Sequence, residues 1–177
     1  YNCLMLLDKY IRDFQFNEVH QIAIGARPQD IYPSLKRIDF SRSKVIKLLF
    51  TIRGLPKRMC SLEGFVDVGF ILLEENDGEE LVIGAIFHPL KFRPVAVSPN
   101  EFIEFNEKDH VKAVMNFLIS EIDENRSLLT TESRVFCTSG KARLLFTPYW
   151  WLIRRFSGLI RIKMLQLIKQ EAEKSSQ

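Results

Sequence analysis

The sequence lacks the residue patterns from which metal, nucleotide and disulfide sites are usually built. Its 177 residues contain three cysteines and three histidines, each far from the others, and no CxxC, HExxH, GxGxxG or GxxxxGK(S/T) pattern occurs. Zinc and phosphate sites depend on such spacings, because these place several ligands or backbone amides around one point. We therefore expect no metal, no cofactor and no catalytic set of a recognisable kind.

The three cysteines, Cys3, Cys60 and Cys137, are an odd number at wide spacing. This usage favours a reducing compartment over a disulfide framework, and we expect a cytoplasmic protein. No apolar run is long enough to cross a membrane, and residues 4–7 are too few for the core of a signal peptide. Because the sequence opens with Tyr1 rather than Met, we expect a short segment to precede it.

What is present is the composition of one globular domain. Hydrophobic residues make up 46% of the chain and charged residues 27%, and 14 phenylalanines dominate the aromatic set. A chain of this size and composition can bury one substantial core. From Thr138 onward there are eight basic and two acidic residues, although the whole chain carries only +3. These basic residues alternate with Leu and Ile, so we expect no nucleic-acid partner.

The first third of the chain predicts one strand and two helices. Alternating apolar residues predict a strand over 14–26, and apolar residues at helical spacing predict a helix over 27–38 that opens with a proline. A second helix is expected from Ser41 until Gly54 ends it, and 56–64 is expected to be a loop.

The middle of the chain predicts an antiparallel hairpin. Asp77-Gly78 lies between apolar runs and indicates a two-residue turn that joins strands over 70–75 and 80–87. The resulting pairs across the hairpin are Phe70 with Ala85 and Leu72 with Ile83, and Glu74 and Leu81 share their face.

A second hairpin joins strands over 111–122 and 126–137. Alternation places one set of side chains on the same face: Ala113, Met115, Phe117, Ile119, Leu129, Thr131, Ser133 and Val135. Glu132 and Arg134 should point outward from the other face, where Asn116 joins them in a cross-strand polar network.

A long helical region begins at Thr138 or Ser139. An unbroken helix to Glu173 would be roughly 50 Å long, which exceeds what a domain of this size can cover. Pro148 and the pair Ser157-Gly158 are therefore the expected places for a kink. One helical face is expected to be buried, and its residues are Ala142, Phe146, Tyr149, Ile153, Phe156, Ile160 and Leu167.

This order of elements resembles that of the START and polyketide-cyclase-like (SRPBCC) superfamily. Several short sequence segments also resemble those of a bacterial branch of this superfamily. These segments are ELVIG at 80–84, AVMNF at 113–117, TESRV at 131–135, FTPYWWLI at 146–153 and FSGLIR at 156–161. The resemblance implies an α+β fold in which a curved antiparallel sheet grips a long C-terminal helix, after two short helices that follow the first strand. We expect a single helix-grip domain over 1–177, with its core at about 14–173.

The same resemblance implies an apolar cavity between sheet and helix that holds a lipid, an isoprenoid or a polyketide-like molecule. The residues expected to line it are Phe70, Leu72, Ile83, Ala85, Phe87, Met115, Phe117, Thr131, Ser133, Tyr149 and Ile153. Phe87 should narrow the cavity. The hydroxyls of Thr131 and Ser133 are equally consistent with binding a ligand's polar end and with bonding inside the sheet.

Three functions remain open from the sequence. Binding or carriage of a hydrophobic small molecule is favoured, since no histidine or carboxylate is clearly directed inward. A cyclase or dehydratase could use the same cavity. A peripheral membrane or protein-interaction module could act through the basic aromatic helix, with Trp151, Arg154 and Arg155 at the surface; the alternative is a core helix whose arginines lie over apolar surface. The oligomeric state stays open.

Overall fold

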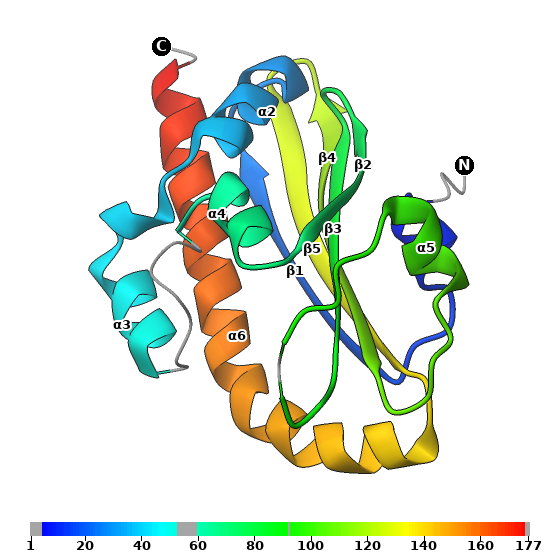
Figure 1. The fold of residues 1–177 in the computed structure, drawn as a ribbon. Helices are drawn as coiled ribbons and strands as arrows, with labels where there is room; N and C mark the ends of the chain where they lie inside the picture. Colours follow the sequence, from blue (N-terminus) through cyan, green and yellow to red (C-terminus); the bar gives the residue numbers. More distant parts are fainter. Residues whose placement is uncertain (1–4, 53–59, 92, 176–177) are drawn as a thin grey trace.

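A five-stranded antiparallel sheet with the order β1-β5-β4-β3-β2 forms the centre of the protein (Figure 1). The computed structural model describes residues 5–52, 60–91 and 93–175. The strands are β1 (Phe16–Ile24), β2 (Ile71–Asn76), β3 (Glu80–Phe87), β4 (Val111–Asp123) and β5 (Arg126–Cys137). The predicted α+β fold is thus confirmed, with the two predicted hairpins in one sheet.

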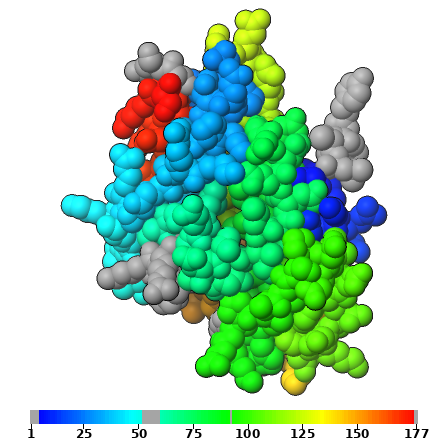
Figure 2. All heavy atoms as spheres, turned by 45° about the horizontal axis from the view of Figure 1, so that its top comes forward, coloured from blue at the N-terminus to red at the C-terminus, as the bar shows by residue number. Residues whose placement is uncertain are grey.

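The helices cover both faces of this sheet. They are α1 (Leu7–Tyr10), α2 (Pro28–Arg37), the short 3₁₀ helix η1 (Phe40–Arg42), α3 (Lys44–Ile52), α4 (Leu62–Asp67), α5 (Pro99–Glu104) and α6 (Gly140–Ser175). The concave face packs against α2, α3, α4 and α6, and the convex face packs against α1 and α5 (Figure 1). Figure 2 shows α2, α3 and α4, coloured blue to teal, lying together over α6.

The helices over 27–38 and from Ser41 onward are confirmed as α2 and α3. The expected loop over 56–64 is wrong in its second half, where α4 begins after Ser61, whose hydroxyl accepts a hydrogen bond of 3.0 Å from the Gly64 amide. Residues 53–59 lie outside the described residues. The sequence analysis assigned no element to the residues that form α5, which starts with a capping box between Ser98 and Glu101.

The predicted pairing of Leu72 with Ile83 in the β2–β3 hairpin is confirmed, although the turn and the strand β2 differ from the prediction. Asn76 pairs with Glu80, so the turn holds three residues rather than two, and Gly78 adopts a φ of 86° within it. A bulge at Leu73 adds one residue to β2 as well, and the two extra residues compensate. The predicted common face of Glu74 and Leu81 is wrong, because the bulge turns Glu74 toward the convex face.

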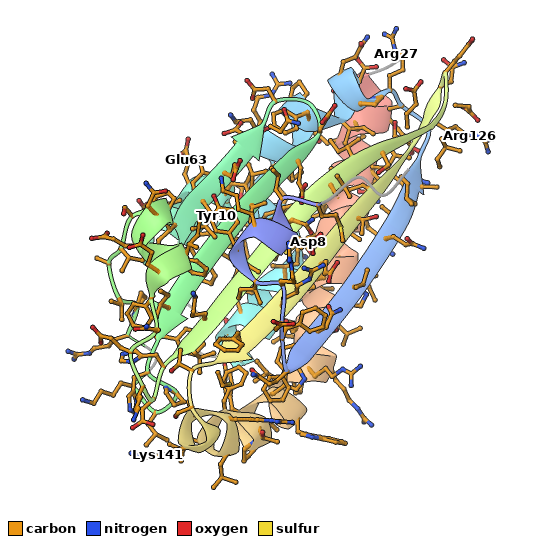
Figure 3. All side chains as sticks on the ribbon, turned by 90° about the vertical axis from the view of Figure 1, so that its right-hand side faces the viewer. Asp8, Tyr10, Arg27, Glu63, Arg126 and Lys141 are labelled. Atoms are coloured by element: carbon orange, nitrogen blue, oxygen red, sulfur yellow. The ribbon has the colours of Figure 1, made fainter. Side chains whose placement is uncertain are left out.

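The polar network on the convex face is confirmed, but its members do not point into solvent. Glu132 and Arg134 are both buried, because α1 lies across this part of the sheet (Figure 3). Arg134 donates hydrogen bonds to Glu132 at 2.7 Å and to Asp8 on α1 at 2.6 Å. Asn116 donates to Glu80 and accepts from the Glu132 amide. The four-residue helix α1, which the sequence analysis did not predict, therefore closes the convex face.

The C-terminal helix α6 runs from Gly140 to Ser175 and bends after its first turns, so that it first crosses one end of the sheet and then follows its concave face (Figure 1). Pro148 lies in the first part and lacks the amide hydrogen that would continue the helical ladder. Trp150 is buried whereas Trp151 is 77% exposed, as the sequence predicts for two consecutive helical aromatics.

Candidate ligand cavity

A cavity of about 640 Å³ lies between the concave face of the sheet and α6. Its floor is formed by side chains of β3, β4 and β5, and one wall by α6. Phe50 of α3, Phe65 of α4 and Val68, which follows α4, supply a second wall. The volume falls in the range of small-molecule pockets, which is about 300–1,000 Å³.

The concave face is divided into a solid half and a hollow half. In the half near the β2–β3 turn, α2 packs against β4. Ile31 and Leu35 of α2 belong to the same hydrophobic cluster as Ile83 and Phe117, and all four are almost completely buried. The other half, around Ala85 and its neighbours, is not filled by these helices. The division follows from the short length of α2, which covers only one end of the strands.

Seven residues that the sequence analysis proposed for ligand binding line the cavity. They are Phe70, Ala85, Phe87, Met115, Ser133, Tyr149 and Ile153. This placement rests on the predicted alternation of β3, β4 and β5 and on the predicted inner face of α6. Their contact with a ligand stays a prediction.

Four proposed residues do not line the cavity, and each has a physical reason. Leu72 lies on the edge strand β2 and is 43% exposed. Ile83 and Phe117 belong to the solid half of the concave face. The hydroxyl of Thr131 is engaged within the protein, since it donates to the Asn116 carbonyl oxygen at 2.8 Å and accepts from Arg161 Nη1 at 3.2 Å.

The polar groups of the cavity are few, and they gather where β5 faces α6. Ser133 is 6% exposed, and its hydroxyl has no hydrogen-bond partner among the described residues. Ser157 and Arg161 line the cavity from α6, and Arg161 donates a hydrogen bond to Thr131 of β5. Tyr149 is an exception, since it lines the cavity twelve residues before Arg161, about 18 Å away along α6. A buried hydroxyl without a partner costs free energy, so a ligand atom that accepts or donates a hydrogen bond here would recover it. This cluster makes one end of an otherwise apolar cavity polar.

A histidine–carboxylate pair lies next to the polar end but not in the lining. His20 Nε2 is 2.9 Å from Glu18 Oε1 on β1. The pair approaches α6 at Gly158, where an added Cβ would lie 2.6 Å from Glu18 Oε1. Gly158 therefore lets the helix approach the edge strand closely, and this explains the glycine better than the predicted kink does.

One wall of the cavity was missed by the sequence analysis. Gly69, between α4 and β2, has a φ of 99°, and a Cβ there would lie 2.5 Å from the ring of Pro94. Val68, Phe70 and Pro94 all line the cavity around this contact. Pro94 lies in no named strand and makes one isolated antiparallel bridge with Phe87. No periodic signal marks such a wall, because it consists of turns.

The described residues provide no group of three His, Cys, Asp or Glu side chains that could hold a metal ion. Within the same described part of the chain, no helix is both long and apolar enough to cross a membrane.

The chain matches no protein-family model and no curated protein by sequence. Solved structures align with most of it. A protein from Mesorhizobium loti aligns with a TM-score of 0.47 and 10% identity, over 90% of this chain and 98% of that one. The Zhui aromatase/cyclase from a Streptomyces species aligns with a TM-score of 0.33 and 12% identity, over 90% and 94%.

A START superfamily protein from Mycobacterium smegmatis aligns with a TM-score of 0.37 and 9% identity, over 89% of this chain and 97% of that one. The structures that align with this chain therefore include a member of the superfamily that its short sequence segments resemble. Because these TM-scores lie below 0.5, nothing about ligand or activity passes from these proteins to this chain.

Proposed function

We propose that this protein binds or carries a hydrophobic small molecule with one polar end in the cavity between the sheet and α6. One observation carries the proposal: the cavity of about 640 Å³ is lined by apolar side chains except at one end, where the unpartnered Ser133 hydroxyl is buried. A lipid, isoprenoid or polyketide-like molecule has this distribution of polarity, and its polar end would lie near Ser133, Ser157 and Arg161.

Binding is favoured over catalysis by the chemistry of the lining. The ionisable side chains among the described lining residues are Arg161 and Tyr149. General acid–base catalysis near neutral pH depends on a histidine, a carboxylate or a similarly tuned group within reach of the substrate. The His20–Glu18 pair lies outside the lining, so a cyclase or dehydratase reaction would require the pair to gain access to the cavity.

The proposal includes a cytoplasmic location. The two cysteines among the described residues, Cys60 and Cys137, are buried free thiols, as a reducing compartment allows. Burial raises the pKa of Cys137 to about 11, which makes this thiol unreactive near neutral pH. The expected membrane contact through Trp151, Arg154 and Arg155 is a separate proposal, argued in the next subsection.

The test is a binding titration with dansyl-labelled undecanoic acid, an amphipathic fluorescent probe. Ala85 is buried on the cavity floor, so Ala85→Trp should fill the cavity and abolish the rise in dansyl fluorescence. Ala23→Trp is the matched control, since Ala23 is an exposed strand residue outside the lining. If Ala85→Trp unfolds, Ala113→Phe supplies a second blockade from the half-buried neighbour on β4.

Equal binding by Ala23→Trp and Ala85→Trp, with both variants folded by circular dichroism, would contradict the proposal. Wild-type protein that binds neither this probe nor a co-purifying apolar molecule, detected by native mass spectrometry, would also exclude it.

A further inference from the structure

The outward side of α6 carries large apolar side chains that nothing in the protein covers. Trp151 is 77% exposed and Leu152 is 69% exposed. The exposed apolar residues of α6 are Leu144, Trp151, Leu152, Leu159 and Ile162. Their spacing places them on one side of a helix, opposite the face that lines the cavity. Isolated exposed leucines are ordinary, but a row of five with a tryptophan at its centre indicates an interaction surface.

The charge around this row has one sign. The sequence holds no Asp or Glu from Ser133 to Gln170. Arg143, Arg154 and Arg155 are exposed, and none of them forms an ion pair with a described residue. Lys141 is the one exposed basic residue near the start of α6 with a described partner, Asp109 at 3.0 Å. The arginines are thus available to an external anion.

The neighbouring helix α3 extends the same pattern. It packs against α6, and its exposed side carries Val45 and Leu48 together with Lys44 and Lys47. No acidic residue occurs in the sequence from Phe40 to Leu62. Two adjacent helices therefore combine exposed apolar side chains with unopposed positive charge.

We propose that this surface, formed by the outward sides of α6 and α3, docks the protein on an anionic lipid membrane. Helices that lie in a membrane interface combine apolar side chains, often including Trp and Leu, with Lys and Arg that meet lipid phosphates. The charge argues for lipid over a second copy of this chain, since two copies would bring the same unpaired arginines together. It also argues for an anionic surface over a neutral one.

The docking surface and the cavity share their walls. Phe50 of α3 and Ile153 of α6 line the cavity from the inner sides of the helices whose outer sides form the surface. Docking would therefore place the helical wall of the cavity against the bilayer, where an apolar ligand could enter or leave. The docking itself does not depend on the cavity holding a ligand, so the two proposals can be tested separately.

The experiment is co-sedimentation of the full chain with vesicles of pure phosphatidylcholine and with vesicles that contain equal parts of phosphatidylcholine and phosphatidylglycerol. We expect binding to the anionic vesicles only, with loss at 1 M salt, where the Debye length falls to about 3 Å. Each arginine near an anionic surface changes binding about fivefold, so Arg154→Gln/Arg155→Gln should weaken binding about 25-fold. Trp151→Ala/Leu152→Ala should reduce it at least tenfold.

Matched controls carry the same substitutions elsewhere. Arg12→Gln removes an exposed arginine that has no ion pair with a described residue, and Ile122→Ala truncates an exposed apolar residue at the end of β4. Both should bind vesicles as the wild type does. Trp150→Phe leaves Trp151 as the single tryptophan, and its fluorescence should shift to the blue when anionic vesicles are added.

Several outcomes would overturn the docking proposal. They are equal binding to both kinds of vesicle, no binding to either, equal loss in the control variants, or a concentration-dependent dimer in sedimentation that Trp151→Ala/Leu152→Ala abolishes without lipid. The dansyl-probe titration is done without vesicles, so failure of the cavity proposal would be seen independently.

Discussion

Glu74 and Glu75 are consecutive residues of β2, and their carboxylates bind helices on opposite faces of the sheet. Glu74 accepts a hydrogen bond of 2.8 Å from Tyr10 of α1 on the convex face. Glu75 accepts one of 2.5 Å from Tyr32 of α2 on the concave face. Successive residues of a strand point to opposite faces, and the bulge before Glu74 decides that Glu74 faces α1 and Glu75 faces α2, because it shifts the alternation of the strand by one residue.

These two carboxylates predict a loss of stability in acid. Hydrogen bonds from Lys9 and then Tyr10 lower the pKa of Glu74, and those from Lys36 and then Tyr32 lower the pKa of Glu75. A carboxyl whose pKa is lower in the folded state stabilises the fold above its unfolded pKa, which is about 4.3. The free energy of unfolding should therefore decrease as the pH falls below this value, and urea titrations from pH 7 to pH 3 would measure it.

The variant Tyr32→Phe isolates one of these contacts. It removes the hydroxyl that bonds Glu75, and we expect the free energy of unfolding to fall by about 1–2 kcal/mol at pH 7. The difference from wild type should shrink as the pH falls from 7 toward 3, because protonation of the Glu75 carboxyl removes the charge that the hydroxyl bonds. A difference that stays constant over this range would show that the Tyr32 hydroxyl acts independently of the Glu75 charge.

Arg134 predicts a larger effect, because it is a buried charge between two carboxylates. Removing one member of a buried ion pair commonly costs about 3–5 kcal/mol, since the remaining charge loses its partner. We expect Arg134→Met to reduce the free energy of unfolding by this amount, as measured in urea. The double variant Arg134→Met/Glu132→Met should be more stable than Arg134→Met alone.

Arg126→Met is the surface control for this prediction. Arg126 pairs with Asp123 at 2.6 Å, but its side chain is 65% exposed. Exposed pairs contribute about 0–1 kcal/mol, so this variant should remain close to wild type. If Arg126→Met and Arg134→Met were equally destabilised, the covering role of α1 over Arg134 would be wrong.

Substitutions at two glycines, Gly69 and Gly78, distinguish the cost of backbone strain from the cost of a side-chain clash. Gly69 and Gly78 both have positive φ, but a Cβ at Gly78 would meet no atom within 4 Å, whereas one at Gly69 would meet Pro94 at 2.5 Å. Gly78→Ala should therefore cost about 1–2 kcal/mol from the backbone alone. Gly69→Ala should cost more and also weaken binding of the dansyl probe. Equal losses of stability in the two variants would argue against the contact between Gly69 and Pro94.

Substitution of Ser133 should weaken ligand binding without reducing the free energy of unfolding. Its hydroxyl is buried without a described partner, so Ser133→Val should leave the free energy of unfolding unchanged or raise it by about 1 kcal/mol. Affinity for the dansyl-labelled acid should fall about threefold to tenfold if this hydroxyl bonds the polar end. A hydrocarbon probe such as diphenylhexatriene, which has no hydrogen-bonding group, should bind both proteins equally.

Ser127→Val is the matched control. Ser127 is also buried on β5, but it donates a hydrogen bond of 2.8 Å to the Ala26 carbonyl oxygen. This variant should lose stability by about 1–2 kcal/mol because a buried acceptor loses its donor. Destabilisation of Ser133→Val to the same extent would mean that the Ser133 hydroxyl has a structural partner.

The sequence predicted those parts of the fold that follow a regular period. The alternation of β4 and β5 correctly assigned Met115 and Ser133 to the concave face and Asn116 and Glu132 to the convex face. Helical spacing correctly placed Ile153 on the buried side of α6. These assignments depend only on which side of a helix or strand is buried. The spacing of apolar residues within that element predicts this side.

The remaining parts depend on contacts between distant segments. The short helix α1 has too few residues for a periodic signal, so Glu132 and Arg134 were expected in solvent. No residue type or spacing in the sequence of β2 predicts the bulge beside Glu74. The division of the concave face into a solid and a hollow half results from where α2 ends, and no alternation within β3 can show that Ile83 is packed while Ala85 faces a cavity.

The position of α6 after all five strands has a consequence for how the protein is made. The edge strand β1 pairs with β5, more than a hundred residues later, and the Gly25 amide donates to Glu173 across 148 residues. A ribosome delivers residues in order, so β1 must wait for β5 and α6 to emerge before either partner exists. Contacts so distant in sequence also slow folding, since a long loop must close first. The nascent chain therefore exposes the part of the concave face that α6 covers until α6 leaves the exit tunnel, and chaperones would have the whole of that interval to bind it.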